Sequence, residues 1–396
     1  MSADDHLPGV RTLWAPSELA PREAALTDPV AAAAVDGVAV DGESGSRSRW
    51  SYFWTWLVTP HIEFGAIYVG MIVVLFLDMS LAQALVGVIL GTAFGAFTHG
   101  LLTANGVRLR VPQMALGTLA SGTKGNRAVT TVMALISSVG WFIVNSVVAG
   151  LALAALFDFS RLGALGIVVV VQLIIAVLGG QVSGVSFRAV QRYLFPVISL
   201  LVVITGIVTF TKVDLSADPG VEWNLNGLIA IVVVGCFSWA YTVGWAPFAT
   251  DYSKYLPTSV SPKEAGIGAA AGLFVATAFL ISIGVCTGIV LEGAGNHDVS
   301  NPTAQFTSVL TGWFADIVLI GLILGPLVNN SISLRSASTV FTEGNLGFSP
   351  AARALVGPVL MSVAAFFLGW AALGDLPANY EGFVMVIGVW VARGST

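Results

Sequence analysis

The apolar run at 50–77, WSYFWTWLVTPHIEFGAIYVGMIVVLFL, is long enough to cross a membrane but is interrupted near its middle by Thr59-Pro60-His61. A second run at 225–249, LNGLIAIVVVGCFSWAYTVGWAPFA, is interrupted at Ser238–Tyr241 and again at Gly244–Pro247. Hydrocarbon offers no partner to a free backbone N–H or C=O, so a broken spanning helix is tolerated only where it lines an interior cavity. Breaks at corresponding places in the two halves of a chain are typical of the binding site of a secondary transporter.

The composition places the chain among membrane proteins. It is 56% hydrophobic and 10% charged, with a mean hydropathy of +0.86, whereas soluble domains carry roughly 25% charged residues. Residues 1–49 are polar and rich in Pro, which predicts a disordered cytoplasmic tail. Cys236 and Cys286 both fall inside apolar runs and are predicted to be reduced packing residues.

From Trp50 onward the sequence predicts ten spans of roughly 20 residues, the length that crosses about 30 Å of hydrocarbon. With breaks in the first and the sixth, they divide into two five-helix repeats, 50–211 and 225–392. Because each repeat has an odd number of spans, the second is inverted in the membrane. The predicted fold is an all-α polytopic membrane protein of two inverted five-helix repeats, with spans at 50–78, 81–103, 128–157, 162–180, 193–211, 225–249, 265–291, 306–334, 354–373 and 378–392.

The distribution of basic residues predicts the orientation of these spans. When the spans are threaded through a membrane, all of the 17 Lys and Arg residues except Arg161 and Lys212 fall on the side of the amino terminus. Cytoplasmic loops carry the excess of Lys and Arg in membrane proteins. The chain is therefore predicted to be a multi-pass protein of the plasma (inner) membrane, with both ends of the ten-span core in the cytoplasm.

The first break carries two ionisable residues, His61 and Glu63, directly after Pro60. An ionisable group inside a span is by default a candidate for function. Either residue is a candidate carrier of a coupling proton, because a buried carboxylate or imidazole can exchange a proton near neutral pH. The alternative is that both side chains are simply solvated in a water-filled vestibule.

The third span carries the sequence GWFIVN at 140–145. Trp141 and Asn145 are four residues apart and so share one face of a helix. An indole ring can stack on a flat heterocycle, and a carboxamide can donate to and accept from its edge. On spacing alone, the pattern is explained better by an Asn that joins two helices and a Trp that fills a core gap.

The sixth and eighth spans add further candidates for the same site. Trp239, Tyr241 and Trp245 cluster around the second break and could form another stacking wall, although aromatic residues are also typical of membrane interfaces. Asn329 and Asn330 follow a Gly-Pro pair in the middle of the eighth span. Two adjacent carboxamides at that depth favour a role in the site over packing alone.

Several of these segments together resemble the nucleobase:cation symporter-1 family, and within it the purine–cytosine permeases. The resemblance is carried by GWFIVN at 140–145, by APFATDYSKYLP at 246–257, by Asn329-Asn330 followed by Ser336, and by the loop from Val111 to Asn126. It extends over about residues 50–392, and the segment DYSKYLP at 251–257 is its most specific part.

The resemblance implies a fold shared with the leucine transporter and with hydantoin transporters, and alternating access around a site at mid-membrane. It implies that Trp141 stacks on the substrate and that Asn145 and Asn330 bond to it. For the sixth span it does not choose among Trp239, Tyr241 and Trp245.

Two departures from the family pattern affect the predicted coupling and the length of the chain. Sodium-coupled relatives have small hydroxyl residues about five positions before the eighth-span asparagine, where this chain has Leu324-Gly325. A hard cation needs oxygen ligands, so the sequence favours H⁺ over Na⁺ as the coupling ion, with no cofactor or bound metal. Relatives have twelve helices, and the resemblance implies that the last two are absent after Trp390.

The resulting hypothesis is a proton-coupled symporter that imports a nucleobase such as cytosine or a purine. The alternatives are a transporter of another flat heterocycle (allantoin, hydantoin, uracil or thiamine) and a truncated remnant that does not transport. An enzyme is not predicted, because the sequence has no His/Cys/Asp metal cluster, nucleophile elbow or glycine-rich phosphate loop. The expected partners are the nucleobase and the lipid bilayer, without nucleic acid.

Overall fold

The computed structural model describes residues 49–77, 79–110, 113, 139–179, 185–216, 218, 220–254, 256, 259–296, 300–343 and 350–395. Over these ranges the chain is helical and contains no strand, as predicted. The predicted tail at 1–49, apart from its last residue, and nearly all of the loop from Val111 to Asn126 lie outside the described residues, as does the first part of the third span.

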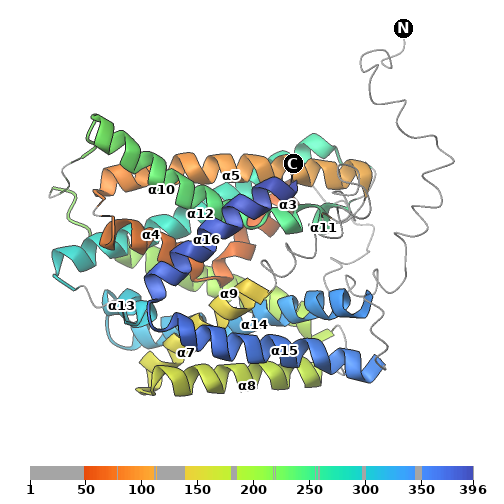
Figure 1. The fold of residues 1–396 in the computed structure, drawn as a ribbon. Helices are drawn as coiled ribbons and strands as arrows, with labels where there is room; N and C mark the ends of the chain where they lie inside the picture. Colours follow the sequence, from red (N-terminus) through yellow and green to blue (C-terminus); the bar gives the residue numbers. More distant parts are fainter. Residues whose placement is uncertain are drawn as a thin grey trace, which may run out of the picture.

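Four of the predicted spans, the first, second, sixth and seventh, pack together into one group of helices (Figure 1). The group consists of α3 (Arg49–Val58), η1 (Thr59–Ile62), α4 (Gly65–Leu75), α5 (Leu81–Leu109), α10 (Leu225–Val243), η3 (Ala246–Phe248), α11 (Ala249–Ser253) and α12 (Pro262–Gly293).

The third, fourth, eighth and ninth spans form a second group, drawn in the lower half of Figure 1. Three further helices, α9, α13 and α16, complete the described part. Of these, α9 contacts η1, α12 and α14, and α16 contacts α10 and α15. The second group consists of α7 (Trp141–Phe157), α8 (Arg161–Gly179), α14 (Trp313–Glu343) and α15 (Pro350–Ala372), and the further helices are α9 (Val185–Phe210), α13 (Pro302–Ser308) and α16 (Leu376–Ser395).

Each of the ten predicted spans contains a helix, although the first and last residues of these helices differ from the predicted bounds. Within the described residues, six helices are long and apolar enough to cross a membrane, and the bent pair formed by α3–η1 and α4 makes a seventh when its two halves are counted as one span. The remaining three predicted spans correspond to α7, α8 and α16. The predicted start of the eighth span at 306 is wrong, because α13 ends at Ser308 and α14 begins only after Gly312, whose φ of 49° lies in the left-handed region.

The break in the first span lies where it was predicted. The chain passes from α3 into the short 3₁₀ turn η1, which contains Pro60, and the two halves of the span meet at an angle of 61°. Glu63 is extended, with φ −115° and ψ 131°, and its N–H donates to the Pro60 carbonyl. Because a proline lacks an N–H and its ring clashes with the preceding turn, a helix kinks or ends at such a position.

The break in the sixth span lies only at the second of its two predicted positions. Residues 238–241 are helical inside α10, so the predicted interruption at Ser238–Tyr241 is wrong. These four residues all keep a backbone N–H and none is Gly or Pro, so the helix continues through them. It ends at Val243, Gly244 follows, and Pro247 lies in the 3₁₀ turn η3 before α11.

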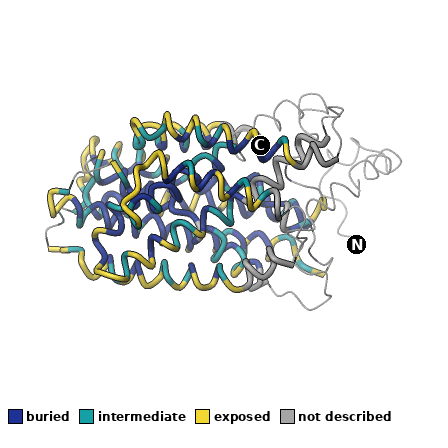
Figure 2. Tube along the Cα trace, turned by 90° about the horizontal axis from the view of Figure 1, so that it is seen from below, coloured by how far each residue is buried: buried dark blue, intermediate teal, exposed yellow. Residues whose placement is uncertain are grey.

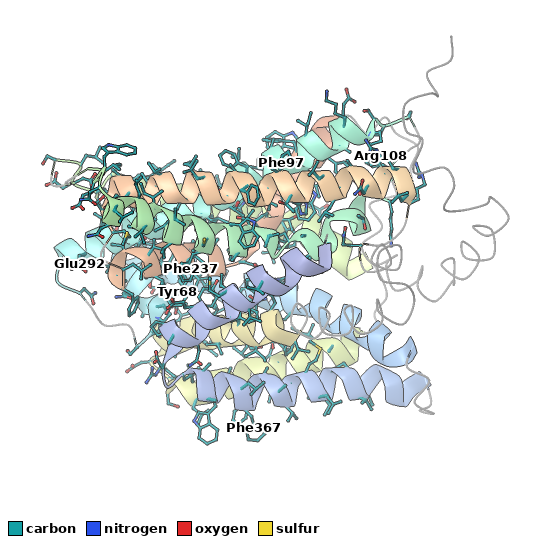
Figure 3. All side chains as sticks on the ribbon, turned by 45° about the horizontal axis from the view of Figure 1, so that its top comes forward. Tyr68, Phe97, Arg108, Phe237, Glu292 and Phe367 are labelled. Carbon is teal, nitrogen blue, oxygen red and sulfur yellow. The ribbon has the colours of Figure 1, made fainter. Side chains whose placement is uncertain are left out.

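Large apolar side chains cover the outside of the helix groups. Phe97 on α5 and Phe367 on α15 are 58% and 56% exposed and point away from the interior (Figure 3). Tyr68 and Phe237 are buried, and Figure 2 shows buried backbone concentrated inside the molecule. A surface of exposed Phe, Leu, Ile and Val around a buried interior is the arrangement that a lipid environment requires.

Candidate functional site

The side chain of Glu63 lies at the centre of the first break and is 5% exposed. Its Oε2 accepts a hydrogen bond of 3.0 Å from the hydroxyl of Tyr241 on α10, and its Oε1 accepts one from Nδ2 of Asn329 on α14. Residues from the first, sixth and eighth spans, which are far apart in the sequence, therefore meet at one carboxylate. We call Glu63, Tyr241 and Asn329 the carboxylate cluster.

Trp141, at the start of α7, packs beside the carboxylate cluster. It is buried, and its ring meets the ring of Tyr241 edge to face, with centroids 5.8 Å apart and planes at 88°. Phe383 of α16 packs against the indole in the same manner at 5.2 Å. Trp141 and Tyr241 thus form a corner of two nearly perpendicular rings.

Gly65 allows these aromatic groups to approach the first span closely. A Cβ at this position would lie 2.6 Å from the hydroxyl oxygen of Tyr380, 3.1 Å from the ring of Tyr241 and 3.4 Å from the indole of Trp141. No larger side chain fits without moving these rings. The glycine therefore brings Tyr380 of α16, Tyr241 and Trp141 to within a few ångströms of the backbone that carries Glu63.

Asn145 and Asn330 form a second polar network, between α7 and α14. Nδ2 of Asn145 donates to Oδ1 of Asn330 at 3.1 Å, and Nδ2 of Asn330 donates to the Phe142 carbonyl at 2.9 Å and to Ser146 Oγ at 3.2 Å. Ser146 Oγ also lies 2.9 Å from Oε1 of Gln172 on α8. Asn330 is thus engaged in joining helices, whereas the adjacent Asn329 faces Glu63.

His61 and Glu63 together line a small cavity. The cavity measures about 20 Å³, and its other walls come from α4, α9, α12, α13 and α14, with Thr205 of α9 among them. His61 is 6% exposed, and its Nδ1 has no hydrogen-bond partner within the described residues. A cavity of this size has room for one water molecule.

A larger cavity of about 140 Å³ also borders the first break. It is mostly apolar and is lined by residues of α4, α7, α15 and α16 together with Pro302, and Phe64 and Gly65 form part of its wall. Glu63 lines the small cavity while its two successors line the large one. The first break therefore contributes residues to the walls of both cavities.

Trp239 and Trp245 pack away from the carboxylate cluster. Trp239 is half-buried and lies against Phe94 of α5, with ring centroids 6.4 Å apart. Trp245 packs against Trp56 of α3 and against Phe248, with ring centroids 6.1 and 6.3 Å apart. Of the three candidate aromatics in the sixth span, only Tyr241 is brought to Glu63 and Trp141. Pro60 is buried in η1 and acts through the turn of the backbone.

Three further residues in this region were not predicted from the sequence. Tyr380 and Phe383 on α16 contact Gly65 and Trp141, and Gln172 on α8 contacts Ser146. Gln172 is a single amide in the run VVVVQLII, and polar residues within a span are a recognised sign of function or helix association. Tyr380 and Phe383 are three positions apart on one helix face, which is a much weaker indication.

No known family profile and no curated protein matches the chain. Solved structures do match. The inward-facing conformation of Mhp1 superposes with a TM-score of 0.64 over 88% of this chain and 75% of that chain, at 16% sequence identity. The chain shares its fold with Mhp1.

Two other solved structures extend the comparison. A closed conformation of Mhp1, described as a nucleobase-cation-symport-1 family transporter with bromovinylhydantoin bound, gives a TM-score of 0.61 at 16% identity over 87% of this chain and 77% of that chain. A variant of the Eremococcus coleocola manganese transporter gives 0.55 at 13% identity over 90% and 79%. These likenesses establish the fold, which is that of an all-helical polytopic membrane protein, as predicted.

Proposed function

We propose that the chain is a secondary active transporter of the nucleobase:cation symporter-1 family, which imports a nucleobase such as cytosine or a purine by alternating access. The observation that carries this proposal is the meeting of Glu63, Tyr241 and Asn329 beside Trp141 at the broken first span. Hydrogen-bonding groups from three spans converge there next to an indole ring. A flat heterocycle with polar edges requires both kinds of contact.

Each group in this region has a role in the proposed transport. Trp141 stacks on the heterocycle, and Tyr241 closes the adjoining side of the site. Glu63 and Asn329 bond to the polar edge, and Asn145 and Asn330 hold α7 and α14 in the register that places these groups. Alternating access then consists of movement between the two groups of helices, with the break at Pro60 as a hinge.

Proton coupling is part of the same proposal. In the described part of the chain, the hydrogen-bond partners of Glu63 are the neutral side chains of Tyr241, Asn329 and Asn145, and no Lys or Arg pairs with it. A buried carboxylate without a cationic partner is costly, and proton uptake removes that cost. His61, which shares the small cavity with Glu63, is the second candidate carrier.

The main alternative substrate is another flat heterocycle, such as hydantoin, allantoin, uracil or thiamine. It is supported by the bromovinylhydantoin bound in the similar Mhp1 structure. The structural likeness to a manganese transporter raises a metal ion as a further possibility. Among the residues that the structure describes, however, no three His, Cys, Asp or Glu side chains are placed to hold a metal ion, so the local chemistry favours an organic substrate.

Uptake into proteoliposomes tests the proposal. Purified protein is reconstituted, and accumulation of labelled cytosine, adenine and hypoxanthine is measured with and without an inward proton gradient. We expect accumulation of at least one of them that depends on the gradient. If none accumulates while labelled hydantoin or allantoin does, the alternative substrate class replaces nucleobases. If no heterocycle is taken up and none exchanges across the membrane, the transporter proposal is wrong.

A further inference from the structure

The donors that surround Glu63 indicate what kind of substrate edge the site recognises. Tyr241 donates to one carboxylate oxygen and Asn329 to the other, and Asn145 of α7 also hydrogen-bonds to the carboxylate. An ionised carboxylate only accepts hydrogen bonds and offers about four lone-pair positions. A ligand with two adjacent donors takes the remaining position and the one that Asn145 occupies.

We propose that Glu63 recognises the hydrogen-bonding edge of the substrate and that the protonation state of its carboxyl group decides which edge fits. The inference rests on the proposed function and deepens it by assigning the substrate edge and the coupling proton to the same group. An ionised Glu63 binds two adjacent N–H donors. A protonated Glu63 binds an edge with one donor and one acceptor.

Which substrate edge fits follows from the hydrogen-bonding chemistry of the ionised and the protonated carboxyl group. The ionised carboxylate has no hydrogen to donate, so an acceptor placed against it leaves a buried lone pair unmatched. The protonated carboxyl donates through its O–H and accepts through its C=O. A ligand with a donor–acceptor edge therefore binds together with one proton, whereas a ligand with a donor–donor edge binds without one.

The other titratable groups near Glu63 do not change from a hydrogen-bond acceptor to a combined donor and acceptor by binding a proton at neutral pH. Tyr241 from α10 and Tyr380 from α16 are buried phenols, and Tyr68 of α4 lies against Tyr380 with ring centroids 5.0 Å apart. His61 shares the small cavity, whose walls from α9 and α12 are apolar apart from Thr205. Asn329 of α14 and Asn145 of α7 are neutral amides. Glu63 is thus the one carboxyl group among the described residues that line either cavity.

The dimensions of the larger cavity suit a single ring. Its volume of about 140 Å³ is close to the roughly 150 Å³ of an engineered cavity that accepts benzene. Phe64 and Gly65, the two residues after Glu63, line it. A six-membered heterocycle placed there lies next to the backbone that carries Glu63, since Phe64 and Gly65 directly follow it.

Two pyrimidines of equal size test the inference. Isocytosine offers an edge with adjacent N–H and NH₂ donors in addition to donor–acceptor edges, whereas cytosine offers donor–acceptor edges only. Binding of each to the purified, full-length protein is measured by calorimetry between pH 5.5 and 8.5, in buffers of different ionisation enthalpy, which reports proton uptake. At pH values where Glu63 is ionised, we expect one proton to bind with cytosine, whose affinity falls about tenfold per pH unit there, and none to bind with isocytosine.

Glu63→Gln supplies the matched variant, because an amide has one donor and one acceptor at every pH. We expect it to bind cytosine without proton uptake and with an affinity independent of pH, and to lose the preference of about tenfold or more for isocytosine over cytosine that the unchanged protein shows where Glu63 is ionised. Thermal unfolding without ligand verifies that the variant is folded. If it is not, the comparison of the two ligands on the unchanged protein still decides.

The results that contradict the inference differ from those that contradict the proposed function. Equal proton uptake with cytosine and isocytosine, or the same pH dependence in Glu63→Gln as in the unchanged protein, overturns the role of Glu63 while leaving a heterocycle transporter in place. If neither these pyrimidines nor adenine or guanine binds at any pH, the proposed nucleobase function fails and this inference fails with it.

Discussion

At the scale of single residues, Trp141 is the aromatic group that the candidate site depends on most. Its edge-to-face contacts with Tyr241 and Phe383 fix the plane of the indole. A ring held in this way gives a ligand a stacking surface at little further cost in conformational entropy. The contribution of the indole can be measured against a tryptophan elsewhere in the chain.

We expect Trp141→Ala to weaken heterocycle binding by about 1–3 kcal/mol, the range found for stacking of a base on an aromatic side chain, which is roughly fivefold or more in affinity. The control is Trp239→Ala, since Trp239 packs against Phe94 away from the carboxylate cluster. Both dissociation constants are measured by calorimetry well below the unfolding temperature. An equal loss in the two variants would mean that the effect is structural.

The sequence identified most of these residues but not how they are combined. Trp141, Asn145, Glu63 and Asn330 stood out because polar or paired groups are rare inside apolar spans. The choice among Trp239, Tyr241 and Trp245 could not be made from spacing. Trp239 and Tyr241, two apart, point to different sides of a helix, Trp245 lies beyond the end of α10 at Val243, and only the tertiary packing shows which of them faces Glu63.

At the scale of helices, local chemistry located the breaks where a proline was present. Pro60 and Pro247 each lie in a 3₁₀ turn. The polar and aromatic residues from Ser238 to Tyr241 suggested a break that does not exist, because such side chains leave the backbone hydrogen bonds of a helix intact. Tyr380 and Phe383 were missed because their contacts with the first and third spans link parts of the chain more than two hundred residues apart.

Gly284 tests how closely α4 and α12 must approach, and Gly382 in α16 provides the control. A Cβ on Gly284 would overlap the carbonyl oxygen of Ile67 and lie 3.0 Å from the Cα of Gly70, whereas nothing lies within 4 Å of a Cβ on Gly382 in α16. We expect Gly284→Ala to lower the unfolding temperature by several degrees, because backbone atoms must move apart. Gly382→Ala is expected to leave it unchanged or raise it, since alanine favours a helix by up to about 1 kcal/mol. Thermal unfolding in detergent measures both, and equal effects would contradict this packing.

The network around Asn330 tests the joining of α7 to α14. Asn330 is fully buried and bonds to Asn145, to Ser146 and to the Phe142 carbonyl. We expect Asn330→Ala to destabilise the protein by on the order of 1 kcal/mol, because interhelical hydrogen bonds in membranes are worth about that much. The exposed Asn379, near the start of α16, donates to the backbone carbonyls of Ala372 and Asp375, which precede that helix, and provides the control variant Asn379→Ala. A loss of stability no greater than in this control would show that the network is not structural.

At the scale of the whole molecule, charge is separated between the two ends of the helices. Arg108 and Glu292 lie at opposite ends in Figure 3. The end with Arg108 also holds Arg110, whose guanidinium contacts the Lys254 carbonyl, and the opposite end holds Asp218, which accepts from the Leu81 N–H at the start of α5. With the division into repeats at 50–211 and 225–392, this asymmetry leads us to propose that the end with Arg108 faces the cytoplasm.

The helix α12 allows a direct test of this orientation. It has 32 residues and at 1.5 Å per residue is about 48 Å long, enough to place Lys263 and Glu292, both exposed, on opposite sides of a membrane. We expect Glu292→Cys to react with a membrane-impermeant maleimide in intact cells, and Lys263→Cys to react only after permeabilisation. The unchanged chain reports the background from Cys236, exposed on an apolar helix face, and from the buried Cys286. The reverse labelling pattern would invert the proposed topology, and labelling of both positions in intact cells would mean that α12 does not cross the membrane.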